Sequence, residues 1–200
     1  MLFKIYYDYL PKTIVRYLMD WRNREEVMVS KWLKDQIEVN REMLEQVIVD
    51  NDLFRTSNDS TVIKVLKWVE ANITYTSDRI QYKTVEKWAT CAETLASGQG
   101  DCEDGAILMY CLCRVAGISH HLICIVAGSV QSGGHCWVRY QSTKYIPGVV
   151  CYLDWCYYYS DLSIYHRAKY MEHNGKVIGS DDYLNLWFIA NDDSAMVFDY

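Results

Sequence analysis

One cysteine of this 200-residue chain stands where a thiol can act as a nucleophile. Residues 98–106 read GQGDCEDGA, so Cys102 follows a glycine-rich turn and directly precedes an apolar run from Ile107 to Ile118. This pattern predicts a helix that begins near Cys102, and the free N–H groups and dipole of a helix N-terminus favour a thiolate. Core packing is the alternative for a cysteine beside an apolar helix. The glycine-rich turn favours the nucleophile.

Two polar residues further along the chain could complete a catalytic group. His135 opens a strand-like run after a Ser-Gly-Gly turn, and Asp154 ends another such run. An imidazole can take a proton from the thiol and deliver it to a leaving amine, while a carboxylate fixes the orientation of the ring. A structural histidine and a strand-end cap are the alternatives. We predict a triad of Cys102, His135 and Asp154.

The charge around Cys102 opposes a thiolate. Asp101, Glu103 and Asp104 flank the cysteine, and unscreened carboxylates raise the pKa of a thiol. A charged His135 would supply the missing cation. Asp101 and Asp104 have the spacing of a helix N-cap and its capping box, and the N–H groups of the first helical turn could stabilise an oxyanion.

Composition excludes several classes of protein. The formal net charge is -6 and no segment concentrates lysine and arginine, which argues against a nucleic-acid partner. Charges close to Met1 argue against a signal peptide, and no apolar run is long enough to span a bilayer, so we expect a cytoplasmic protein without a membrane partner. The eight cysteines include no CxxC pair, which favours free thiols and gives little support to a metal site.

Hydrophobic periodicity predicts a helical first half and a strand-rich second half. A polar stretch over residues 55–60 divides an N-terminal helical extension, 1–55, from a second unit, 56–200. We expect an α+β fold in which the Cys102 helix packs on an antiparallel sheet. The expected helices are Pro11–Asn23, Glu25–Asp50 and Thr61–Asn72, and the expected strands are Leu122–Ala127, His135–Tyr140, Val149–Asp154 and Leu184–Ala190, with a hairpin turn at Asn174-Gly175.

The motifs between Thr61 and Trp155 resemble those of the transglutaminase-like superfamily of papain-related folds, and in detail those of bacterial and phage transglutaminase-like cysteine peptidases. The motifs that carry the resemblance are Trp88, Glu93-Thr94-Leu95, residues 98–104, Gly134-His135-x-Trp137 and Leu153-Asp154. The resemblance implies a papain-like core and acyl transfer through a thioester, with no metal or organic cofactor. It assigns Cys102 as the nucleophile, His135 as the base and Asp154 as the group that orients it. Trp88 is a candidate oxyanion donor or site wall, with core packing as the alternative.

Three functions follow from this pattern. The first is a cysteine-dependent amide hydrolase, a peptidase or amidase that acts on a protein or peptide substrate. The second is a protein-crosslinking transglutaminase, in which an amine resolves the acyl-enzyme. The third is a structural protein that keeps the fold and docks on a larger assembly such as a phage particle, which would place the chain in the virion. Two departures from the family pattern, Cys136 and Cys91, leave every catalytic group in place.

Overall fold

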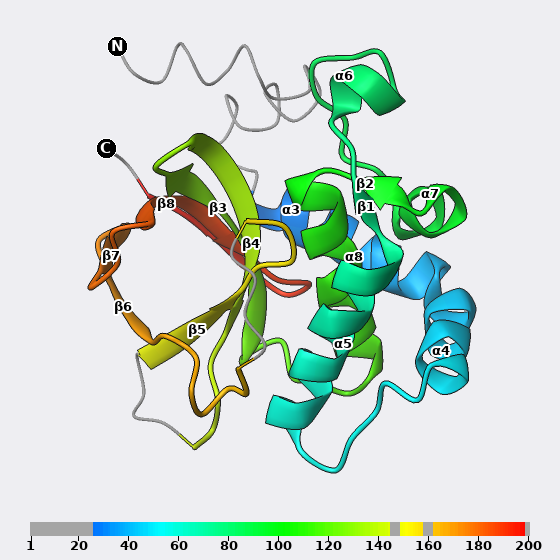
Figure 1. Ribbon diagram of the computed structural model, residues 1–200, viewed down its shortest axis with the longest axis horizontal. Coiled ribbons are helices and arrows are strands. Elements are labelled where there is room, and N and C mark those ends of the chain that lie inside the picture. The colour runs from blue at the N-terminus through cyan, green and yellow to red at the C-terminus, as the bar shows by residue number, and fades with distance from the viewer. Residues whose placement is uncertain (1–25, 145–148, 158–161, 199–200) are drawn as a thin grey trace.

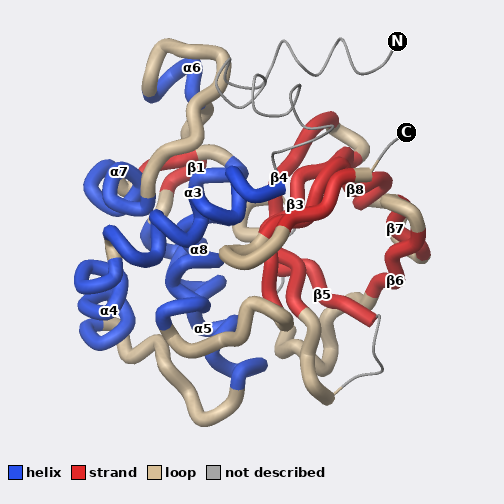
Figure 2. Tube along the Cα trace, turned by 180° about the vertical axis from the view of Figure 1, so that it is seen from behind, coloured by secondary structure: helices blue, strands red, loops and turns tan. Residues whose placement is uncertain are grey.

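The computed structural model describes residues 26–144, 149–157 and 162–198. Helices gather on one side of the molecule and strands on the other (Figure 1 and Figure 2), which confirms the predicted mixture of helix and sheet. The helix predicted over Pro11–Asn23 lies outside the described residues. Among the described residues, no helix is both long enough and apolar enough to cross a lipid bilayer.

The helix that begins at Cys102 is the centre of the molecule. This helix, α8 (Cys102–Val115), is buried over the whole stretch from Glu103 to Cys113. It packs against the sheet through β4 and against the helices α3, α4 and α5 (Figure 1). A helix that is apolar on every side requires such enclosure, since any exposed face would leave apolar surface in water.

Three helices upstream cover α8. The helix predicted over Glu25–Asp50 is two helices, α3 (Glu26–Val39) and α4 (Arg41–Asp50), separated at Asn40. Both contribute buried leucines, Leu33 and Leu44, to the core that contains α8. The third, α5 (Asn58–Asn72), begins after Ser57, whose Oγ accepts from Ser60 N at 3.3 Å. The polar stretch therefore caps a helix as expected, while the division at residue 55 stays a prediction.

Short elements connect α5 to α8. They are β1 (Thr74–Tyr75), α6 (Asp78–Gln81), α7 (Cys91–Ser97) and β2 (Gln99–Gly100). Strand β1 pairs in parallel with β2, and this pairing holds the chain in place just before α8 begins.

The strands form a closed ring, which corrects the expected simple sheet. The order β3-β4-β5-β6-β7-β8 is closed by pairing of β3 with β8, giving a six-stranded barrel in which all pairs are antiparallel. Glycine at 128 permits the closure, since a Cβ there would lie 2.1 Å from the carbonyl oxygen of Asn185 on β8. Aromatic side chains, among them Trp137, Tyr152 and Tyr183, fill the interior. The strands are β3 (Ile123–Val130), β4 (Gly133–Tyr140), β5 (Val149–Leu153), β6 (Tyr170–His173), β7 (Lys176–Ile178) and β8 (Tyr183–Ala190), with β9 (Ala195–Val197) paired to β8.

The hairpin predicted at Asn174-Gly175 is confirmed. The two residues join β6 to β7 with φ angles of 47° and 72°, the left-handed conformation that a two-residue type I′ turn requires.

Candidate active site

Cys102 is the first residue of α8, as the sequence predicts. Its Sγ hydrogen-bonds with Oε2 of Glu103 at 3.1 Å, and the residue is partly buried. The carbonyl oxygen of Cys102 accepts from Trp155 Nε1 at 3.1 Å. Trp155 reaches it because residue 105 is glycine, where a Cβ would lie only 2.2 Å from the indole ring. Trp155, which directly follows Asp154, therefore holds the first turn of α8 in place.

The predicted capping box at the start of α8 is wrong. Asp101 has the extended backbone of an N-cap residue, but its side chain makes no capping hydrogen bond. The Oδ1 atom of Asp104 accepts instead from Ala89 N at 2.7 Å. The carboxylate therefore ties the segment after Trp88 to the start of α8.

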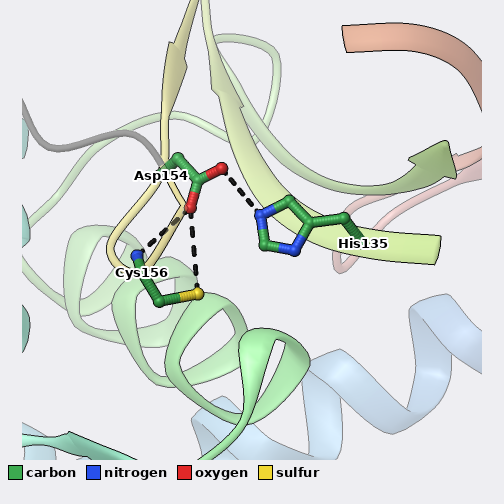
Figure 3. Close-up of side chains that lie close together, drawn as sticks. All are labelled: His135, Asp154 and Cys156. Atoms are coloured by element: carbon green, nitrogen blue, oxygen red, sulfur yellow. Dashed lines mark hydrogen bonds and ion pairs between the residues drawn. The ribbon is translucent and has the colours of Figure 1, made fainter. Parts of the chain in front are cut away.

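His135 and Asp154 are paired as predicted. His135 lies on β4, Asp154 directly follows β5, and His135 Nε2 is 2.7 Å from Asp154 Oδ2 (Figure 3). Both residues are buried, at 8% and 1% exposure. A carboxylate oxygen accepts only, so Nε2 of His135 donates this hydrogen bond. In a neutral ring with its proton on Nε2, the lone pair is on Nδ1.

Asp154 is held by more than the histidine. Its Oδ2 also accepts from the hydroxyl of Tyr183 at 2.8 Å, and its Oδ1 accepts from Tyr157 N at 3.0 Å and Cys156 N at 3.2 Å. Four donors on one carboxylate fix its position. Tyr183 comes from β8, across the barrel interior, and sequence reasoning did not identify it.

A second thiol lies beside this pair. Cys156 Sγ is 3.9 Å from Asp154 Oδ1, and donor atoms of His135, Asp154 and Cys156 all lie within 4.8 Å of one another. Figure 3 shows the thiol, the carboxylate and the ring converging above α8. Sequence reasoning missed this thiol, which is one of eight cysteines in the chain. Its place two residues after Asp154 was the signal that could have identified it.

The surroundings of Cys102 in the structure oppose the thiolate that the sequence predicts. Burial, followed by the nearby charge of Asp101, raises the pKa of the Cys102 thiol well above its ordinary value. The opposing hydrogen bond to Glu103 does not offset these effects. These surroundings favour the neutral thiol of Cys102 over the thiolate.

Two aromatic residues lie near the start of α8. Trp88 is partly buried, with its ring centroid 5.9 Å from that of Trp32 and 6.1 Å from that of Phe188, so one side of it packs on the core. Its role as an oxyanion donor stays a prediction. Tyr75 is 54% exposed, with its ring 6.1 Å from Trp155, and its pKa is raised by burial and by charges at Cys102 and Asp101. Sequence reasoning missed this exposed ring near Cys102.

Five carboxylates gather at the start of α8, and we call them the acidic cluster: Asp78, Glu86, Asp101, Glu103 and Asp104. Ligand oxygens lie within 4.8 Å of one another in two overlapping sets that share Asp78. Burial raises the pKa of Glu86, Asp101 and Asp104 to about 7, and it also raises the pKa of Glu103 and Asp78.

The hydrogen bonding of the acidic cluster is incomplete. Asp78, Asp101, Glu103 and Asp104 are each at least nine-tenths buried, and each has one oxygen without a hydrogen-bond partner among the described residues. An unpaired buried carboxylate must bind a proton or a cation to avoid a large desolvation cost. Clustered carboxylate oxygens are the ligands that Ca²⁺ and Mg²⁺ prefer.

Comparison with known proteins agrees with the motifs. Residues 48–150 match the family model of the transglutaminase-like superfamily. Among solved structures, the chain is similar to EGTA-treated LapG from Legionella pneumophila, with 16% identity over 84% of each chain and a TM-score of 0.56. It is equally similar to calcium-bound LapG, with 16% identity over 80% of this chain and 87% of that one and a TM-score of 0.57. No curated protein sequence matches the chain.

Proposed function

The chain belongs to the transglutaminase-like superfamily, and on this basis we propose that it is a cysteine-dependent amide hydrolase, a peptidase or amidase, that acts through Cys102, His135 and Asp154. The observation that carries the proposal is the hydrogen bond of 2.7 Å between Asp154 and His135, which lies on β4, a strand packed against the helix that begins at Cys102. This bond leaves the free nitrogen that a neutral thiol needs as its base.

In the proposed reaction, His135 acts first as a base and then as an acid. His135 Nδ1 takes the proton from Cys102 as Sγ attacks the amide carbonyl, and the imidazolium then returns this proton to the leaving amine. The product is a thioester on Cys102. A water molecule then gives a proton to Nδ1 and attacks the thioester carbonyl. The tetrahedral intermediate that forms releases the carboxylic acid, and the Cys102 sulfur takes the proton back from Nδ1. Backbone N–H groups of the first turn of α8 are the donors available to the oxyanion.

We propose further that the acidic cluster binds a divalent cation with the preferences of Ca²⁺. The support is its buried oxygens without partners, and one LapG structure is a calcium-bound form. Asp78, Asp101, Glu103 and Asp104 would hold the ion. A bound cation would neutralise the carboxylate charge beside Cys102 and so lower the pKa of its thiol. The prediction of no metal rested on the absence of a CxxC pair, whereas Asp78 and Glu86 join Asp101, Glu103 and Asp104 only in the fold.

Alkylation by iodoacetamide at neutral pH tests the catalytic proposal without knowledge of the substrate. We expect Cys102 to be labelled much faster than Cys113, a buried thiol of the same helix. His135→Ala should slow the labelling of Cys102 by about 100-fold, the lower range of general-base effects. Cys113→Ala is the control and should leave it unchanged. Equal labelling rates at Cys102 and Cys113, or no effect of His135→Ala, would reject the proposal.

A second measurement separates hydrolysis from transamidation. Labelled casein is incubated with the protein, with Ca²⁺ and a fluorescent primary amine present. Hydrolysis predicts peptides whose release is lost in Cys102→Ser. Incorporation of the amine into casein without peptide release would instead identify a transglutaminase.

A further inference from the structure

Cys156 brings a sulfur ligand to the His135–Asp154 pair. Cys156 is partly exposed, whereas His135 and Asp154 are buried. The proposed reaction does not use this thiol. Its position therefore needs a separate account.

The three side chains offer one sulfur, one nitrogen and one oxygen, a donor set that suits Zn²⁺ and similar thiophilic ions rather than Ca²⁺. Zinc bonds of about 2.0–2.3 Å in tetrahedral geometry place neighbouring ligand atoms roughly 3.2–3.8 Å apart. Here Nε2 and Oδ2 are 2.7 Å apart, Sγ and Oδ1 are 3.9 Å apart, and the ligand atoms all lie within 4.8 Å. Small side-chain rotations would bring them onto one ion.

The surroundings also suit a metal ion. Ligating carboxylates are usually held by outer hydrogen bonds, and Asp154 already accepts from the Tyr183 hydroxyl and from Tyr157 N. Three protein ligands leave a fourth position for water. Because Cys156 is partly exposed, an ion can reach the site from its side.

We propose that Cys156, His135 and Asp154 form a binding site for Zn²⁺ that inhibits the enzyme. On binding, the Cys156 thiol loses its proton to solvent and the sulfur bonds to the ion. The imidazole proton moves from Nε2 to Nδ1, so that Nε2 can bond to the ion. One proton is released for each ion bound.

Inhibition follows from the change at the ring. With Nε2 on the metal and a proton on Nδ1, His135 has no lone pair with which to accept the proton of Cys102. This consequence rests on the proposed function, whereas binding of the ion does not.

Co²⁺ is the spectroscopic probe for the site, because a thiolate bound to Co²⁺ gives a sulfur-to-metal charge-transfer band in the near ultraviolet. The full chain is titrated with Co²⁺ in saturating Ca²⁺, which occupies the acidic cluster and contributes no such band. We expect the band in the unmodified protein and in Cys102→Ser, and its loss in Cys156→Ser, with circular dichroism showing that each variant is folded. Calorimetry with Zn²⁺ in two buffers of different ionisation enthalpy should give one proton released per ion.

The outcomes separate this proposal from the catalytic one. Loss of the band in Cys102→Ser with retention in Cys156→Ser, or a folded unmodified protein without the band, would overturn the site. Zn²⁺ should also slow iodoacetamide labelling of Cys102 in the unmodified protein but not in Cys156→Ser. If Co²⁺ gives the band but Zn²⁺ does not slow the labelling of Cys102, the metal site stands and its inhibitory effect is rejected. Unreactive Cys102 would reject the catalytic proposal and leave the cobalt result to decide the site.

Discussion

At the scale of single residues, the hydroxyl of Tyr183 decides how firmly Asp154 holds His135. Its removal in Tyr183→Phe takes one donor from a buried carboxylate, and hydrogen bonds to charged groups contribute about 1.5–3 kcal/mol. We expect the labelling of Cys102 by iodoacetamide to slow by at least about tenfold, because 1.4 kcal/mol corresponds to a factor of ten in rate.

Tyr152→Phe is a matched control for this prediction. Tyr152 lies in the same aromatic cluster, with its ring 4.9 Å from that of Tyr183, and its hydroxyl also donates to a carboxylate, that of Glu172, at 2.8 Å. It should lower the melting temperature by a similar amount while leaving the labelling of Cys102 unchanged. Equal slowing in both variants would mean that Tyr183 acts only through stability.

The sequence supported the His135–Asp154 pair because both residues stand at strand ends within recognisable motifs. It showed Asp101, Glu103 and Asp104 beside Cys102, but it could not indicate that Tyr183 reaches Asp154 or that Asp78 and Glu86 complete the acidic cluster. Tyr183 reaches Asp154 only because β8 closes the barrel, and Asp78 reaches Asp104 only through the loop that carries α6. Neither contact leaves a periodic pattern, since the partners are 29 and 26 residues apart.

At the scale of elements, Asp192 fastens the turn between β8 and β9 to the C-terminal part of α8. Its carboxylate accepts from Arg114 Nε at 2.7 Å and Nη2 at 3.0 Å, and also from the hydroxyl of Tyr110. Burial alone would raise its pKa, but these hydrogen bonds and the charge of Arg114 lower it below the ordinary value. We expect Asp192→Asn to reduce the free energy of unfolding by about 1–3 kcal/mol near neutral pH.

The pH dependence of this contribution has a definite sign. Because the folded pKa lies below the unfolded one, the unfolded chain binds protons first as the pH falls. The stabilisation is complete above the unfolded pKa of about 4 and is lost as the pH falls through the folded pKa. Urea unfolding between about pH 5 and about pH 3 should show the stability difference between the two proteins shrinking. Asp193→Asn, at a side chain 66% exposed, is the control and should have little effect.

At the scale of the whole molecule, a cation in the acidic cluster would link the loop before α7 to α8. Saturation at 100 times the dissociation constant would stabilise the fold by about 2.7 kcal/mol. We therefore expect Ca²⁺ to raise the melting temperature and excess EGTA to reverse the change. Asp78→Asn should weaken this response, whereas Asp59→Asn should preserve it, because Asp59 belongs to a separate network with Tyr140 and Ser142. If Ca²⁺ does not change the melting temperature, the proposed cation site in the acidic cluster is wrong.

Element types could be predicted across most of the described chain, because hydrophobic periods of 3.6 and 2 residues are local signals. The break at Asn40 and the closure of the sheet could not. Closure depends on the pairing of β3 with β8, two strands about 60 residues apart in the sequence. A single glycine at position 128 does not indicate which strand will approach it. Docking on a phage particle stays a prediction.

The strand that closes the barrel, β8, also carries the hydroxyl that donates to Asp154. Separation of β8 from β3 would therefore remove a hydrogen bond from the His135–Asp154 pair, while α8 and Cys102 could stay folded. On the proposed mechanism, local opening of the barrel at this strand would abolish activity before the whole protein unfolds.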